Sequence, residues 1–157
     1  MLTSPGLPCC QRCLSRRSLL GAAAAGAAAA ILPAGCGRAS ASVESGPIAA
    51  GNVSALTVNT LQVLDGPNVV IGRDTGGLYA MSAVCTHAGC VVVTAGSTAA
   101  AGLVCDCLGS QFDAIGDVTR GPAGTPLQHY AVDVDASGNI TVHGDQPVAA
   151  DVRTPSP

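Results

Sequence analysis

Between residues 47 and 144, short apolar runs alternate with clusters of turn-forming residues. Gly, Asp, Asn and Pro separate the runs, and no stretch in this region keeps the 3.6-residue period of an amphipathic helix. Runs of this length that are rich in Val, Ile and Leu predict β-strands. The predicted strands are residues 68–72, 78–82, 90–93, 102–104, 127–134 and 140–142.

Two polar segments between these runs have the composition of hairpin turns. They are Asp-Thr-Gly-Gly at residues 74–77 and Asp-Ala-Ser-Gly-Asn at residues 135–139. The pattern therefore predicts an all-β domain, a small antiparallel sandwich or barrel. Residues 145–157 contain three prolines and no periodicity, which predicts a frayed, disordered tail.

The N-terminal third has a different pattern. Ser-Arg-Arg-Ser-Leu-Leu at residues 15–20 precedes an Ala/Gly-rich apolar run, small residues and Cys36. This order is typical of a twin-arginine export signal, a route that carries proteins already folded, often around a cofactor. We therefore expect a leader and tether over residues 1–45, one domain over residues 46–144, and the tail over residues 145–157.

The sequence of the leader is compatible with three kinds of processing. Leu-Pro-Ala-Gly before Cys36 resembles a lipobox with a lipidated cysteine, although Pro33 replaces the usual aliphatic residue. Ala-Ser-Ala at residues 39–41 resembles an ordinary signal peptidase site, and an uncleaved signal would be a membrane anchor. The lipidated form is favoured, at the outer face of the membrane. The leader cysteines Cys9, Cys10 and Cys13 are interpreted as disposable.

Length and charge narrow the class of protein. The chain has 157 residues, enough for one modest domain and an export segment. Its formal net charge is −3, and the part after residue 35, with ten acidic residues and four Arg, carries a net charge of about −6. An exported acidic domain is a poor partner for nucleic acid, which we exclude.

Four cysteines beyond Cys36 lie in two short segments. Residues 85–90 read Cys-Thr-His-Ala-Gly-Cys, and residues 105–112 read Cys-Asp-Cys-Leu-Gly-Ser-Gln-Phe. An even number of cysteines in an exported domain is consistent with two disulfides. The Cys-x-His and Cys-x-Cys spacings instead favour a metal site, because they bring thiolates and an imidazole together.

These segments resemble the Rieske family, whose loops read Cys-Thr-His-x-Gly-Cys and Cys-x-Cys-His-Gly-Ser. The resemblance continues through Gly-Pro-Ala at residues 121–123 to Tyr130. It implies a Rieske-type sandwich or barrel with two cluster-binding loops and a [2Fe-2S] cluster. The implied ligands are Cys85 and Cys105 on one iron and His87 on the other. The resemblance also implies that Cys90 and Cys107 form a disulfide.

Leu108 stands where the family has its second histidine ligand. A leucine side chain has no lone pair, so it cannot bind iron. His129 and His143 are expected to face solvent on their strands, and we do not expect either of them to replace the missing ligand. One iron would then lack a protein ligand, which puts the occupancy of the cluster in doubt.

Two further residues are implied to influence the cluster. Ser110, next to Gly109, resembles the family serine whose hydroxyl donates to a bridging sulfide. Phe112 stands where members of highest potential have a tyrosine. Hydrogen bonds to sulfur raise the potential, so the phenylalanine implies a lower value. Core packing explains Phe112 equally well.

The implied function is electron transfer from quinol or a partner oxidoreductase to a cytochrome, as in the Rieske subunit of cytochrome bc complexes. The alternative is a cluster-free structural or binding module, with a second disulfide between Cys85 and Cys105. A recent or artefactual change at Leu108 is a third interpretation, because every other residue of the motif is present.

Overall fold

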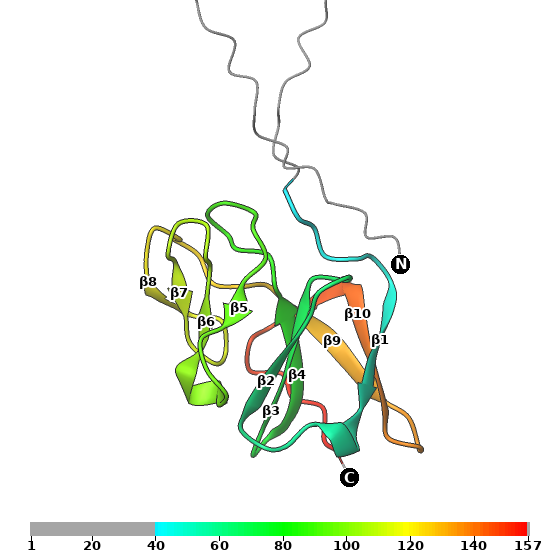
Figure 1. Cartoon of the computed structure of the whole chain (residues 1–157). Coiled ribbons are helices and arrows are strands. Elements are labelled where there is room, and N and C mark those ends of the chain that lie inside the picture. Colours follow the sequence, from blue (N-terminus) through cyan, green and yellow to red (C-terminus); the bar gives the residue numbers. More distant parts are fainter. Residues whose placement is uncertain (1–39, 157) are drawn as a thin grey trace, which may run out of the picture. The chain divides into compact units, whose positions relative to one another are not determined.

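A computed structural model describes residues 40–156 of the chain. These residues form two antiparallel sheets (Figure 1). The larger sheet has the strand order β1-β10-β9-β4-β3-β2 and the smaller one has the order β5-β6-β7-β8. Helical structure in the described residues is confined to two 3₁₀ turns, Val53–Ala55 and Ala99–Ala101. The prediction of an all-β antiparallel domain is confirmed.

The smaller sheet is an insertion between two neighbouring strands of the larger one, β4 and β9. The larger sheet contains β1 (Pro47–Asn52), β2 (Thr60–Leu64), β3 (Val69–Asp74), β4 (Gly77–Ser82), β9 (His129–Val134) and β10 (Asn139–Val148). The smaller sheet contains β5 (Val93–Thr94), β6 (Leu103–Val104), β7 (Gln111–Phe112) and β8 (Val118–Arg120).

Both predicted hairpin turns are present, and each depends on an aspartate. The Asp74 carboxylate accepts hydrogen bonds from the backbone N–H groups of Gly76 (2.7 Å) and Gly77 (3.1 Å) between β3 and β4. Asp135 accepts from the N–H groups of Ser137 and Asn139 between β9 and β10. These local bonds explain why the turns could be predicted from sequence.

Four strands were not predicted from sequence, namely β1, β2, β7 and β8. The β1 sequence, Pro-Ile-Ala-Ala-Gly-Asn, has little intrinsic strand preference, and it is extended because it pairs with β10. The strands β7 and β8 have two and three residues. Segments this short have no periodicity to detect, so only their pairing identifies them.

Two hydrophobic cores meet at β3 and β4. On β3, Val69 and Ile71 pack in the first core, whereas Val70 packs in the second. On β4, Met81 lies in the second core with Val70 and is fully buried. Because side chains alternate across a strand, these two strands form a wall with one core on each face.

The second core contains the two cysteines of the described residues that are not in a disulfide. It packs β3 and β4 against the smaller sheet and the segment that precedes β9. Its members outside β3 and β4 include Cys85, Val92, Leu103, Cys105, Phe112 and Leu127. The packing of this core therefore fixes the position of the candidate site.

The N-terminal tether was predicted to extend to residue 45, but the structure places its last residues on the domain. The Ala41 N–H donates to the carbonyl of Gly89 at 2.9 Å, and Asn68 Nδ2 donates to the Ser42 carbonyl at 2.7 Å. Both partners are in loops distant in sequence, so no local pattern could predict these contacts. The folded domain includes residues 41–45.

The predicted export signal lies outside the described residues, as do Cys9, Cys10, Cys13 and Cys36. Within the described part of the chain, no helix has the length and apolar character needed to cross a membrane.

The prediction of a disordered tail over residues 145–157 is wrong for most of that segment. Strand β10 continues to Val148, and Thr154 pairs with Leu78 of β4 through two backbone hydrogen bonds of 2.9 Å. The Thr154 hydroxyl also donates to the Val132 carbonyl at 2.6 Å. Prolines and a lack of periodicity did not prevent order, because the segment forms hydrogen bonds to β4 and β9.

Arg153 fastens this C-terminal segment by its side chain. Its Nε donates to the Asp74 carboxylate at 2.7 Å, and its guanidinium carbon lies 4.3 Å from the centre of the Tyr79 ring. Partial burial raises the pKa of Asp74, but Arg153 and the N–H groups of Gly76 and Gly77 outweigh it and hold the pKa below its ordinary value. The ion pair therefore stabilises the fold when Asp74 is ionised.

We expect the Arg153→Ala variant to lose about 1–2 kcal/mol of unfolding free energy, the sum of an ion pair and a cation–π contact. Urea denaturation at neutral pH measures this loss. The matched control is Arg120→Ala, which removes an exposed arginine from β8 and should change the unfolding free energy by less than about 0.5 kcal/mol.

The loss of unfolding free energy in the Arg153→Ala variant should become smaller at acidic pH. The folded-state pKa of Asp74 is depressed, so its contribution is present above the unfolded pKa of about 3.9 and is lost as the pH falls through the folded pKa. A deficit that stays constant down to about pH 2 would contradict the role of the ion pair.

Candidate metal centre

Loop 1 (residues 85–90) is closed by its own backbone. The Cys85 N–H donates to the Cys90 carbonyl at 2.8 Å, and the Gly89 N–H donates to the Cys85 carbonyl at 2.9 Å. Gly89 has φ +66°, in the left-handed region that favours glycine. This tight turn holds Cys85 at the base of the loop and His87 at its tip.

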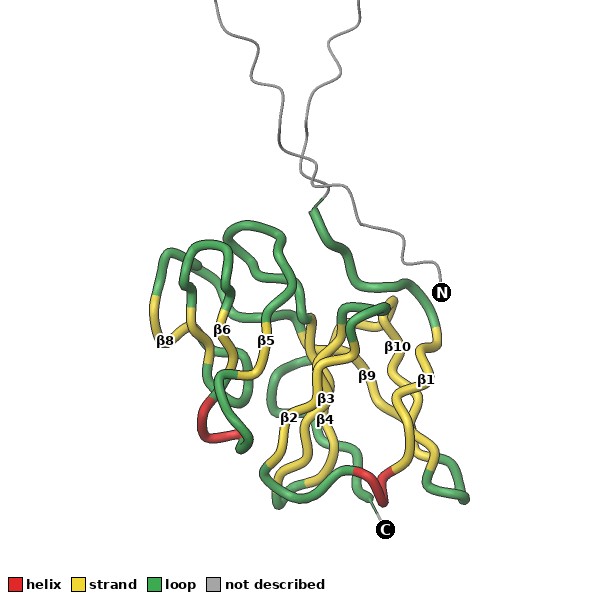
Figure 2. The backbone as a smooth tube through the Cα atoms, viewed as in Figure 1, coloured by secondary structure: helices red, strands yellow, loops and turns green. Residues whose placement is uncertain are grey.

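Loop 2 (residues 105–110) repeats this geometry. The Cys105 N–H donates to the Ser110 carbonyl and the Gly109 N–H donates to the Cys105 carbonyl, both at 2.8 Å. Gly109 has φ +77°. Both loops lie at the same end of the smaller sheet (Figure 2). The shared pattern of backbone bonds gives Cys85 and Cys105 equivalent positions in their turns.

The Cys85 thiol is buried and surrounded by hydrogen-bond donors. Burial raises the pKa of the Cys85 thiol. The N–H groups of Ala88 and His87 and the side chains of Cys105 and Ser110 outweigh this effect, so the pKa lies below its ordinary value. The residue is 1% exposed and its sulfur is not in a disulfide. The loop therefore stabilises negative charge on this sulfur.

The Cys105 thiol is completely buried beside it. Burial and the hydrogen bond with Cys85 raise the pKa of Cys105, although the N–H groups of Cys107 and Leu108 act in the opposite direction. Two thiols that share a hydrogen bond cannot ionise independently, so the first proton is lost from the pair as a unit. Both sulfurs face backbone N–H groups, an arrangement that suits thiolate ligands of a metal.

Cys90 and Cys107 form a disulfide between the two loops, with an S–S distance of 2.06 Å. The pairing implied by the Rieske resemblance is confirmed. The other pairing of the two-disulfide interpretation, Cys85 with Cys105, is absent because both thiols are free. The Cys105 sulfur lies within 4.8 Å of both disulfide sulfurs. Those three atoms are not a metal site, since disulfide sulfurs offer no thiolate.

A third segment, which includes Gly-Pro-Ala at residues 121–123, fastens both loops. The buried Ser110 hydroxyl accepts from the Ala123 N–H at 3.0 Å, which leaves its own proton for the Cys85 sulfur. The Thr86 hydroxyl donates to the Thr125 carbonyl at 2.7 Å. The contact of Thr86 was not predicted from the sequence, where the only signal was its position next to a candidate ligand.

His87 and Leu108 are exposed at the tips of the loops, and the Leu108 side chain is 59% exposed. Gly109 beside it is exposed as well, with no atom within 4 Å of the place a Cβ would take. The structure thus places one imidazole and one leucine at the accessible end of the site, above the two buried thiols.

The two remaining histidines are not in the loops. The expectation that His129 faces solvent is wrong: it is 3% exposed, stacks on Tyr79 with ring centres 6.1 Å apart, and donates through Nε2 to the Ile115 carbonyl at 2.8 Å. Its strand lies next to β4, where that face is covered by the second core. His143 Nε2 lies 2.8 Å from the Asp133 carboxylate on the larger sheet.

Phe112 is 2% exposed in the same core as Cys85 and Cys105. Core packing is therefore confirmed as a role of this side chain. The phenyl ring offers no hydroxyl to a ligand sulfur, so within the described residues the side-chain donor to Cys85, apart from Cys105, is Ser110.

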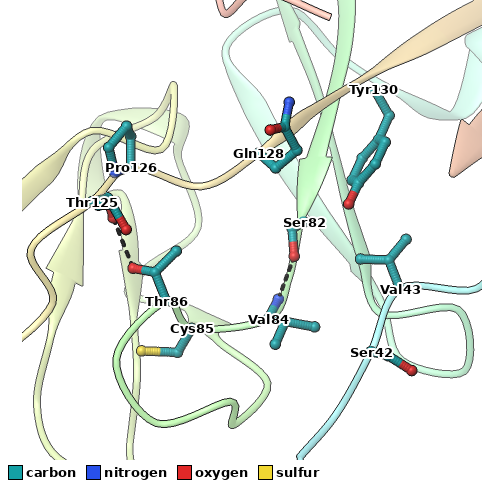
Figure 3. Close-up of a pocket in the computed structure, with 10 residues that line it drawn as sticks. All are labelled: Ser42, Val43, Ser82, Val84, Cys85, Thr86, Thr125, Pro126, Gln128 and Tyr130. Carbon is teal, nitrogen blue, oxygen red and sulfur yellow. Dashed lines mark hydrogen bonds between the residues drawn. The ribbon is translucent and has the colours of Figure 1, made fainter. Parts of the chain in front are cut away.

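A cavity of about 580 Å³ lies beside loop 1, on the side of Cys85 and Thr86 (Figure 3). Its lining carries no charged side chain. It consists of Ser42, Val43, Ser82, Val84, Cys85, Thr86, Thr125, Pro126, Gln128 and Tyr130. Neither His87 nor Cys105 contributes, so the cavity is separate from the tips of the loops.

Residues 47–131 match the family described as the Rieske [2Fe-2S] domain. The chain belongs to this family. The Rieske domain is 42% identical over 86 residues to the cytochrome b6-f complex iron-sulfur subunit of Parasynechococcus marenigrum, covering 55% of this chain and 46% of that relative. The corresponding subunit of Trichodesmium erythraeum is 49% identical over 74 residues, covering 47% and 39%. The chain spans less than half the length of these curated relatives.

Among solved structures, the chain is similar to the plasma membrane Rieske protein PetC3 of Synechocystis PCC 6803. It is 30% identical, with a TM-score of 0.49, over 60% of this chain and 97% of that one. The ferredoxin of carbazole 1,9a-dioxygenase from Nocardioides aromaticivorans is 26% identical, with a TM-score of 0.46, over 63% and 98%. The family assignment rests on the sequence match over residues 47–131.

The residues of this Rieske domain fit a [2Fe-2S] cluster in three of the four positions that the family pattern supplies. Cys85 and Cys105 present two adjacent buried sulfurs that face N–H groups, and His87 presents an imidazole at the tip. The fourth position does not fit, because Leu108 has a hydrocarbon side chain.

Replacing both disulfide cysteines of the Rieske domain (Cys90→Ser with Cys107→Ser) should lower the unfolding free energy by about 3 kcal/mol, since the disulfide closes a short loop. The separation in sequence is 17 residues. Urea denaturation with and without a reductant measures the effect. The reductant should destabilise the native chain by a similar amount and leave the double variant unchanged; an equal effect on both would contradict the assignment.

Proposed function

We propose that this Rieske domain transfers electrons, with a [2Fe-2S] cluster held between loop 1 and loop 2. The ligands that the chain supplies are Cys85, Cys105 and His87, and Ser110 and Gly109 lie beside them. When bound, such a cluster accepts and releases one electron at a time. The observation that carries the proposal is the pair of adjacent buried thiols, each facing two backbone N–H groups.

The chain's own residues prepare this site for charge. Backbone N–H groups and the Ser110 hydroxyl donate toward the ligand sulfurs, and such bonds favour the reduced, more negative state. Ala123 and Leu127 are buried in the same core as the cysteines and exclude water from that side. The Cys90–Cys107 disulfide keeps the loops together in both states.

The redox partners contact the tips of the loops. His87 and Leu108 are exposed there, whereas Cys85 and Cys105 are covered by protein elsewhere. The relatives named as subunits of the cytochrome b6-f complex support a cytochrome as electron acceptor and a quinol-oxidising or other redox enzyme as donor. The acidic charge of the chain disfavours nucleic acid as a partner.

The cluster-free alternative has less support. It would replace the metal with two covalent bonds, but Cys85 and Cys105 are not bonded to each other. If these positions served only the stability of the fold, two apolar side chains would serve better than two free thiols that face backbone donors. Leu108 remains the observation in its favour.

Iron and acid-labile sulfide analysis of the full chain, purified without oxygen, tests the proposal. We expect iron and sulfide in equal amounts, with the visible absorption and the EPR signal of a reduced [2Fe-2S] cluster. The variants Cys85→Ser and Cys105→Ser should lose both iron and sulfide, because they remove thiolate ligands.

His143→Ala is the matched control, since this histidine pairs with Asp133 on the larger sheet, away from the loops. It should keep the full iron content. A native chain that contains neither iron nor sulfide after reconstitution would overturn the electron-transfer proposal.

We also infer that residues 1–39 are a leader with a twin-arginine signal, followed by a single domain that ends with the ordered C-terminal segment. The favoured anchor is a lipid on Cys36, and the alternatives are an uncleaved signal and a cleaved domain released outside the membrane. The paired Arg16 and Arg17 before an apolar run support export, and Ala-Gly before Cys36 supports lipidation.

Fractionation of cells that express the full chain tests this inference. Replacing both signal arginines with lysine (Arg16→Lys with Arg17→Lys) should leave the protein in the cytoplasm. Cys36→Ser should release an exported protein from the membrane fraction. Membrane retention of the Cys36→Ser variant would favour the uncleaved signal, and export of the double lysine variant at the native level would contradict the twin-arginine route.

A further inference from the structure

The geometry of the two loop tips points to an open coordination position at residue 108, which binds a neutral nitrogen donor of the imidazole class from outside the domain. The position belongs to the [2Fe-2S] site of the proposed function, on which this inference rests. Its basis is a mismatch: the loops keep the shape of a four-ligand site, and the chain supplies three ligands.

The Leu108 position is accessible from solvent. Its side chain is 59% exposed, and the neighbouring Gly109 is exposed with open space around it. A small ring can therefore approach the site along the face that the absent histidine would occupy. The leucine methyl groups provide an apolar wall for the carbon edge of such a ring.

The loop keeps its shape without a ligand at this position. Loop 2 is closed by backbone bonds between Cys105, Gly109 and Ser110, none of which uses the side chain of residue 108. The adjacent Cys107 is fixed by its disulfide. The Leu108 N–H still faces the Cys105 sulfur. The shape of the loop therefore does not depend on the side chain of residue 108, and leucine supplies no donor atom there.

No histidine of this chain can fill the position. The chain has three histidines, and His87 already serves loop 1. His129 is buried, and its Nε2 is bonded to the Ile115 carbonyl. His143 lies on β10 and is bonded to Asp133. To bring either of these to loop 2 would require a strand of the larger sheet to unpair.

Asp106 is the exposed carboxylate of loop 2. By the shared hydrogen-bond pattern, Asp106 corresponds to Thr86 of loop 1, and that side chain leaves the tip to bond Thr125. A carboxylate would also add negative charge next to two thiolates, which a neutral imidazole does not. The site therefore favours a neutral nitrogen donor.

Imidazole is the probe that tests the inference. The full chain with its cluster assembled is titrated without oxygen, and the EPR g values and visible absorption are recorded at each imidazole concentration. We expect a saturable spectral change in the native chain. The Leu108→Ala variant, which has the same missing donor and more space, should respond at an equal or lower imidazole concentration.

The Leu108→His variant is the decisive control. Its own imidazole occupies the position, so its spectrum should not change on titration, and it should resemble that of the saturated native chain. A native chain with a full cluster and no response to imidazole would overturn the inference and leave the electron-transfer proposal standing. An equal response of Leu108→His would also overturn it, since imidazole would then bind elsewhere.

A separate experiment is needed for Cys36 as a possible source of the fourth ligand. It lies outside the described residues, four positions before Ser40, and Ser40 packs on loop 1, where a Cβ added to Gly89 would lie 2.9 Å from its Cβ. If a Cys36 thiolate filled the position, imidazole would act on Cys36→Ser and not on the native chain, which would overturn the inference. Absence of iron and sulfide would instead overturn the proposed function itself.

A second copy of the chain is the other source of the same donor. In that case the spectrum of the native protein without imidazole should change with protein concentration, in parallel with dimer formation in sedimentation experiments. This result would support the open position and show that a side chain of the second copy supplies the donor.

Discussion

Two cysteine sulfurs lie side by side in the interior of this domain, and the rest of the structure has to make that arrangement stable. Burying two groups that carry charge as thiolates costs free energy unless donors face them. The chain supplies those donors from its backbone: each loop turns so that two N–H groups face the sulfur of its first cysteine. Gly89 and Gly109 allow the turns, and one disulfide keeps the loops in contact.

The same core that stabilises the fold also positions the site. Strands β3 and β4 are buried on both faces, and one face packs against Cys85, Cys105 and Phe112. The segment before β9 closes the other side through Ser110 and Thr86. A change in the packing of this core would therefore move the sulfurs, so stability and ligand geometry are coupled.

Leu108 shows that fold and coordination depend on different parts of the same loop. The turn is built from backbone bonds and the disulfide, and the side chain at position 108 is exposed. Replacement of a histidine there costs the fold little, whereas it removes a donor atom that nothing else in the described residues supplies. This explains how an intact Rieske frame exists together with an incomplete ligand set.

The sequence by itself determined the features that depend on neighbouring residues. These are the aspartate turns at residues 74–77 and 135–139, the central strands, and the two loops with their cysteines, which together identified the Rieske family. Only the tertiary structure decided the features that depend on distant partners. Strand β1 is extended through β10, the C-terminal segment is ordered by Leu78 and Asp74, and His129 is buried against Tyr79. Spacing alone left the cysteine pairing open: the family resemblance implied the Cys90–Cys107 disulfide, and the packing of the two loops brings those sulfurs together and leaves Cys85 and Cys105 unbonded.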